Sequence, residues 1–154
     1  MRKLIPLLLA LMLALSPALA APQLSDSLFA AAKQAAEWLV TGRYDRLADA
    51  MPFSGAAPDA DEWASFAANY AAYGHAQQDY AVAYWINGGW RVAVPMLTPD
   101  DGDVEVLLLT SEDGYSFSGY RYAAWSQVES EYAVSDHVVW NDEYVPFAPR
   151  LFAD

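Results

Sequence analysis

The sequence contains no cysteine and only two histidines, His75 and His137. Without cysteine the chain can form no disulfide, offers no thiolate nucleophile and carries no lipid-attachment site behind a leader peptide. Two histidines are too few for a multi-histidine metal site, and they limit the choice of acid–base groups. Because no covalent crosslink is available, the folded chain must be held together by its hydrophobic core alone.

Basic residues are also scarce, since 8 Lys and Arg stand against 20 Asp and Glu and give a net charge of −12. Nucleic acids and anionic lipids both require a basic footprint on the protein, so we expect neither as a partner. Such acidity serves solubility, or it steers a basic protein partner onto an acidic face. The sequence leaves both alternatives open.

The sequence has no apolar stretch long enough to span a membrane. The apolar run at residues 4–15 follows a positively charged start and ends before Pro17, short of the roughly 20 residues that a transmembrane helix needs. Ala18 and Ala20 are the small residues that a signal peptidase recognises. We predict that residues 1–20 are a cleaved signal peptide and that the mature chain is exported, to the periplasm or outside the cell, without a membrane anchor.

The first half of the mature chain has helical periodicity. Ser25 can cap a first helix, whose apolar positions recur at helical spacing and whose end is predicted at Gly42. A second, short helix is expected to end before Pro52. Asp59 and Glu62 have the spacing of a capping box, which predicts the start of a third helix that is rich in aromatic residues.

The second half has the periodicity of strands. From about Gln78 onward the apolar period changes to two, and Asn87-Gly88-Gly89 is typical of a hairpin turn. Pro95 in the returning strand predicts an edge position or a bulge. Further strands are expected at residues 104–110 and 115–123.

The C-terminal region is harder to assign from its pattern. Residues 127–134 fit either a helix or a strand, and residues 137–147 look extended. We divide the chain into a signal peptide at 1–20, a single domain at 21–123 and a C-terminal extension at 124–154 that packs on this domain.

Helices followed by a meander of strands predict an α+β fold, with the N-terminal helices packed on one face of a curved antiparallel sheet. This order, with the Gly42-Arg43-Tyr44-Asp45 junction between the first two helices, resembles the cystatin-like cone of the nuclear-transport-factor-two superfamily, which includes ketosteroid isomerase. The resemblance implies a pocket inside the cone and a homodimer that pairs through the sheet. It implies no particular reaction, because one fold supports many functions.

Reactive side chains are few, and none belongs to a known catalytic motif. His137 follows Asp136 and could form an acid–base pair with it, although neighbours in an extended segment face opposite sides. His75 is expected at a junction or on the surface, and Asp79 is the acid at the start of the first strand. No Gly-rich phosphate loop and no Gly-x-Ser-x-Gly elbow occurs, so we expect no cofactor.

Two groups of charged residues remain as candidate ligand sites. Four carboxylates crowd into one turn without the spacing of a known calcium loop, so we expect a solvated turn and no metal there: Asp100, Asp101, Asp103 and Glu105. Arg91 and Arg121 lie within predicted strands. Each could meet an anionic ligand group or pair with a neighbouring carboxylate.

Aromatic residues are abundant, with 6 Trp and 10 Tyr. They suit both cores and binding surfaces, because they combine apolar area with a polar group. Tyr84 and Trp85 face opposite sides of one strand, so either helices cover both faces of the sheet or one face is open. Our candidate ligand-binding residues are Trp63, Tyr70, Tyr84 and Trp90.

Three functions are consistent with these features. The first is an exported non-catalytic domain that binds a small apolar ligand or a protein partner through an aromatic pocket or a sheet face. The second is a cone-fold isomerase, dehydratase or hydrolase with a buried acid whose pKa is raised by apolar surroundings. The third is an acidic inhibitor or immunity-like protein that masks a basic exported partner.

Overall fold

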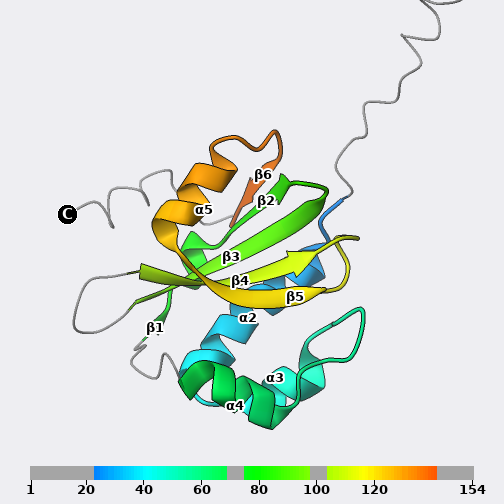
Figure 1. The fold of residues 1–154 in the computed structure, drawn as a ribbon, viewed down its shortest axis with the longest axis vertical. Coiled ribbons are helices and arrows are strands. Elements are labelled where there is room, and N and C mark those ends of the chain that lie inside the picture. The colour runs from blue at the N-terminus through cyan, green and yellow to red at the C-terminus, as the bar shows by residue number, and fades with distance from the viewer. Residues whose placement is uncertain (1–22, 69–74, 98–103, 142–154) are drawn as a thin grey trace, which may run out of the picture.

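The computed structural model describes residues 23–68, 75–97 and 104–141, and it confirms the α+β class (Figure 1). The helical elements are α2 (Asp26–Val40), α3 (Tyr44–Ala50), α4 (Ala60–Ala68), the 3-10 helix η1 (Gln78–Tyr80) and α5 (Trp125–Tyr132). The strands are β1 (His75–Ala76), β2 (Val82–Ile86), β3 (Gly89–Leu97), β4 (Val104–Ser111), β5 (Gly119–Ala124) and β6 (Val138–Trp140). None of the described helices is long and apolar enough to cross a bilayer.

The two helix starts that were predicted from capping residues are confirmed. Ser25 precedes α2, and its hydroxyl accepts a hydrogen bond from the Leu28 amide at 3.1 Å. Before α4, the Asp59 carboxylate accepts from the Glu62 amide at 2.8 Å, while the Glu62 carboxylate accepts from the Asp59 amide at 2.9 Å. These reciprocal bonds satisfy amide groups that a helix leaves without partners at its first turn.

The strands form one antiparallel sheet in the order β5-β4-β3-β2-β6, with β1 paired to the far end of β3. Asn87 and Gly88 have φ angles of 52° and 75° in the β2–β3 hairpin, which confirms the predicted turn. The predicted edge position of Pro95 is wrong, because β3 lies between β2 and β4. Pro95 instead sits opposite the break between β1 and β2, where its carbonyl accepts from the Gln77 amide at 2.8 Å and no N–H is required.

Two strands begin later in the chain than predicted. The segment from Gln78 first forms η1, so β2 begins at Val82. The strand predicted at 115–123 begins at Gly119, because the Asp113 carboxylate accepts from the amides of Tyr115 and Ser116, both at 2.8 Å. This side-chain bonding holds a turn in place of a strand ladder.

The two faces of the sheet carry separate hydrophobic cores. Helices α2, α3 and α4 pack on one face, over inward-pointing residues such as Val92 and Leu109. Helix α5 packs on the opposite face, over Val82 and Leu108 (Figure 1). Helices therefore lie on both faces, the first of the two alternatives left open by Tyr84 and Trp85.

The C-terminal part of the described chain completes the sheet. Residues 125–132 form a helix, and β6 pairs with β2 in the register Val82–Trp140, Ala83–Val139 and Tyr84–Val138. The β6 strand is thus an edge of the sheet.

The start of α2 is fixed by the turn between β4 and β5. The Ser25 amide donates to the Gly114 carbonyl at 2.9 Å. Gly114 has a φ of +79°, and a Cβ atom there would collide with the Gln23 carbonyl oxygen. Only glycine fits both the conformation and the close approach.

Candidate functional site

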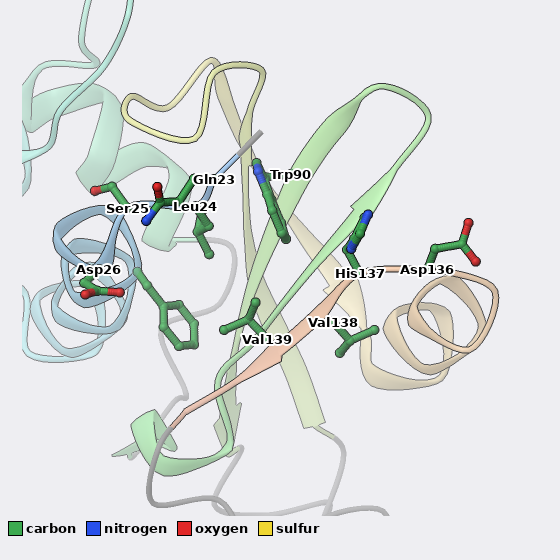
Figure 2. Close-up of a pocket in the computed structure, with 10 residues that line it drawn as sticks. Gln23, Leu24, Ser25, Asp26, Trp90, Asp136, His137, Val138 and Val139 are labelled. Atoms are coloured by element: carbon green, nitrogen blue, oxygen red, sulfur yellow. The ribbon is translucent and has the colours of Figure 1, made fainter. Parts of the chain in front are cut away.

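A groove opens on the surface between the start of α2 and the edge strand β6 (Figure 2). Its main cavity has a volume of about 460 Å³. The lining comes from three parts of the chain: Gln23, Leu24, Ser25, Asp26, Phe29, Trp90, Asp136, His137, Val138 and Val139. We call this cavity, with the adjoining one described below, the β6 groove.

Helix α2 and strand β6 form the walls of the groove, and Trp90 on β3 contributes to its floor. The Phe29 ring projects from α2, and the Val139 side chain lies on the helix-facing side of β6, 41% exposed. Trp90 is only 3% exposed and packs edge-on against Trp85, with ring centroids 5.7 Å apart. The groove therefore offers apolar side chains above a rigid, buried floor.

A second cavity of about 230 Å³ continues the groove toward the end of β6. It shares Asp26, Phe29 and Val139 with the first cavity. At its far end the Lys33 ammonium donates to the Asn141 side-chain carbonyl at 2.7 Å and lies 5.4 Å from the centre of the Phe29 ring. This contact ties α2 to the end of β6 and sets the width of the groove.

Among the described strands, β6 pairs with β2 alone. The His137 carbonyl accepts from the Trp85 amide at 3.0 Å, and the Asn141 amide donates to the Ala81 carbonyl at 3.2 Å, both toward β2. Because bonding directions alternate along an antiparallel strand, the N–H and C=O of Val138 point away from β2. No described strand pairs with β6 on that side, and Val138 also lines the groove.

The rim of the main cavity is acidic. Asp26 and Asp136 line it, and none of the described Lys or Arg residues does, whereas Lys33 lines the adjoining cavity. His137 is exposed and is the other titratable side chain among the described lining residues. With a net charge of −12 on the whole chain, the groove favours a cationic over an anionic ligand.

The structure describes three of the four predicted ligand-binding residues and does not bring these three together. Trp90 lines the β6 groove. Trp63 is fully buried in the α2-side core, with its ring centroid 4.4 Å from that of Tyr120. Tyr84 is fully buried on the opposite face, and Tyr70 lies outside the described residues.

The hydroxyl of Tyr84 has a structural partner. It donates to the Glu131 carboxylate on α5 at 2.7 Å. Burial raises the pKa of Tyr84 far above its usual value, and the Glu131 carboxylate raises that pKa further. A phenol held in this state acts as a hydrogen-bond donor that fastens α5 to the sheet.

The candidate catalytic groups lie apart from one another and are exposed. His75 is on β1, and Asp79 is in η1. Asp136 and His137 are neighbours, but their side chains point in different directions (Figure 2). None of the described Asp, Glu and His side chains is fully buried.

The remaining charged candidates are the acidic turn and the two arginines. The turn with Asp100, Asp101 and Asp103 lies outside the described residues, and within the described ranges no three acidic or histidine side chains could hold a metal ion. Arg121 pairs with Glu131 at 3.8 Å. Arg91 donates to the Trp90 carbonyl at 3.3 Å.

Sequence reasoning missed most of the groove. The sequence pattern identifies Phe29 only as a residue of an amphipathic helix. It identifies Val138 and Val139 only as part of a short extended segment. Lys33 and Asn141 are 108 positions apart, so no local pattern could place α2 beside β6.

Scans against protein-family models, curated proteins and solved structures found no match to this chain. Helices packed against an antiparallel sheet are compatible with a cone-like fold. Membership of the nuclear-transport-factor-two superfamily stays a prediction.

Proposed function

We propose that this protein is a non-catalytic binding domain that takes an extended, basic segment of a partner protein along the edge of β6. The observation that carries the proposal is the position, beside an apolar groove, of a strand edge with which no other described strand pairs. An extended peptide that adds to a sheet edge gains affinity from main-chain hydrogen bonds and specificity from pockets for alternate side chains. Val138 offers the main-chain groups, and Phe29, Trp90 and Val139 offer the pocket.

The charge of the groove supports a basic partner. Asp26 and Asp136 lie on its rim, and the chain as a whole is strongly acidic. Complementary charge speeds association and selects against acidic competitors. The proposal therefore joins the protein-partner hypothesis with the masking hypothesis that rests on net charge.

The proposal places this activity outside the cytoplasm. Its basis is the leader-like start of the chain, with a basic beginning, an apolar run at residues 4–15 and small residues at 18 and 20. An exported domain without cysteine must keep its binding edge in place by packing, which the Lys33–Asn141 contact and the β2–β6 pairing provide.

The experiment that tests the proposal is selection from a random peptide library displayed on phage, with the chain lacking residues 1–20 as bait. We expect enriched peptides in which Lys or Arg alternates with apolar or aromatic residues. Their binding should weaken as salt rises, because exposed charges are screened within about 10 Å at 0.1 M salt. Failure to enrich any peptide, or enrichment of acidic ones, would contradict the proposal.

Two substitutions at one position separate the strand edge from the side chain. Val138→Pro removes the N–H that points away from β2, whereas Val138→Ala keeps it and shortens the side chain by two methyl groups. We expect the proline variant to bind a selected peptide about fivefold more weakly than the alanine variant, since one hydrogen bond contributes about 1 kcal/mol. Equal affinity of the two variants would show that the peptide does not pair with β6.

A small apolar ligand is the second candidate, and the volume of the main cavity favours it. About 460 Å³ lies within the roughly 300–1,000 Å³ of small-molecule sites. Such a ligand would quench or shift Trp90 fluorescence in the Val138→Pro variant as strongly as in the parent chain. A response that depends on Val138 supports the peptide instead.

A further inference from the structure

A row of side chains crosses the sheet on the face that carries α5, opposite the β6 groove. The strand registers place its members directly beside one another on four neighbouring strands: Tyr84, Arg91, Thr110 and Gly119. In the adjacent row, Arg121 on β5 faces Leu108 on β4, which puts Arg121 diagonal to Thr110. Diagonal neighbours on one face of a sheet are within reach of long side chains.

Arg91 has no acidic partner in the described part of the chain. It is half-buried, and its guanidinium lies over the backbone of the hairpin end, where it donates to the Trp90 carbonyl at 3.3 Å. The ion pair found among the described residues is the 3.8 Å contact of Arg121 with Glu131. Among the described residues Arg91 therefore has no counter-ion, although the chain has a net charge of −12.

Both guanidinium groups lie near enough to Tyr84 to influence its hydroxyl. The hydroxyl of Tyr84 is subject to the charges of Arg121 and Arg91, which lower its pKa, although burial and Glu131 raise it more. Because Glu131 pairs with Arg121 at 3.8 Å, Arg91 is the guanidinium of this face that has no carboxylate partner among the described residues.

Hydroxyl groups and open space lie beside the two arginines. The Thr110 and Ser118 hydroxyl oxygens are 3.3 Å apart, and Ser118 is exposed. Gly119 leaves the position next to Thr110 without a side chain, and a Cβ atom there would lie 3.0 Å from the Thr110 hydroxyl. Helix α5 covers the Tyr84 end of this row, whereas at the other end Thr110 is half-buried and Ser118 is exposed.

We propose that this face binds an oxyanion group, either a carboxylate or a phosphate, with Arg91 as its main ligand and with Arg121, Thr110 and Ser118 as supporting donors. Guanidinium groups bind both anions through paired N–H donors, and hydroxyls supply the remaining hydrogen bonds. The site is on the opposite face from the β6 groove. Its existence does not depend on the proposed peptide binding.

The test is a titration of the chain with sodium phosphate and, separately, sodium acetate at constant ionic strength, followed by NMR of the backbone amides and the arginine Nε–H groups. We expect saturable shifts at Thr110, Gly119 and the Arg91 Nε–H. Saturation by phosphate alone identifies a phosphate site, and saturation by acetate identifies a carboxylate site.

Three variants distinguish specific anion binding from general charge effects. Arg91→Gln should weaken anion binding about tenfold or more, and Arg91→Lys should weaken it less because the charge remains. Arg46→Gln removes an exposed arginine of α3 and should leave binding unchanged. Linear shifts with both anions, or saturation that survives in a folded Arg91→Gln protein, would overturn the proposal.

Discussion

Two aromatic regions on the same side of the sheet have opposite characters. Around Trp63 the rings of Phe53, Phe66 and Tyr120 close on one another, with centroids 4.4 to 6.3 Å from that of Trp63, and fill the space between α4 and β5. Trp90, in contrast, lies beneath an open groove. The comparison teaches that aromatic content alone does not mark a binding site, because the same residue type stabilises the fold in one region and faces a cavity in the other.

The largest expected effect comes from emptying the closed region. Trp63→Ala should lower the free energy of unfolding by about 3–5 kcal/mol, because it leaves a cavity in a packed core. The indole N–H of Trp63 has no hydrogen-bond partner among the described residues, so Trp63→Phe should cost much less. Urea unfolding of both variants measures the difference, and equal losses would show that the cluster is not close-packed.

A smaller loss of stability is expected at the turn that fixes the start of α2. Gly114→Ala should cost roughly 1–3 kcal/mol, since alanine is strained at positive φ and its Cβ meets the Gln23 carbonyl. Gly55→Ala is the matched control, because a Cβ atom there meets nothing within 4 Å. Thermal melting of both variants measures the difference, and equal unfolding temperatures would contradict this account.

Phe29, which lines the open groove, provides the corresponding prediction for that region. Phe29→Ala should cost only about 1–2 kcal/mol of stability, because the ring is partly exposed, yet it should weaken binding of a selected peptide about tenfold. Tyr115→Ala removes a 61% exposed ring outside the groove and should change neither property. The measurement is fluorescence anisotropy of a labelled peptide, and unchanged affinity of the Phe29 variant would place the site elsewhere.

The smallest effect depends on pH. Hydrogen bonds from the amides of Tyr115 and Ser116 lower the pKa of Asp113 from 3.8 to about 2. A carboxyl whose pKa is lower in the folded state stabilises that state above pH 3.8, and this contribution disappears as the pH falls toward 2. Melting curves of Asp113→Asn should therefore depend less on pH between 2 and 4 than those of the parent chain, and parallel curves would contradict the assignment.

Local patterns in the sequence predicted the parts of the fold that local chemistry controls. The Ser25 cap, the Asp59–Glu62 capping box and the Asn87-Gly88 turn each depend on residues within one turn of the chain. The strand start at Gly119 was missed because the Asp113 side chain competes for amides that a strand would use. The position of Pro95 was misjudged because the break between β1 and β2 arises from pairing across the sheet.

The candidate site was far less predictable than the fold. Trp90 was singled out for its residue type, and its place on the groove floor depends on α2 and β6 meeting above it. Phe29 and Val139 are ordinary members of their elements, and only the tertiary structure brings them together. One edge of β6 pairs with β2 and the other with no described strand, and neither strand's sequence indicates which edge is which.

The most direct test of the central claim is hydrogen exchange at Val138 with and without a selected peptide. If the peptide adds to the sheet edge, the Val138 amide should exchange more slowly in the complex, while the Val139 amide, which the register directs toward β2, should change little. Peptide binding that leaves the Val138 exchange rate unchanged would contradict the account.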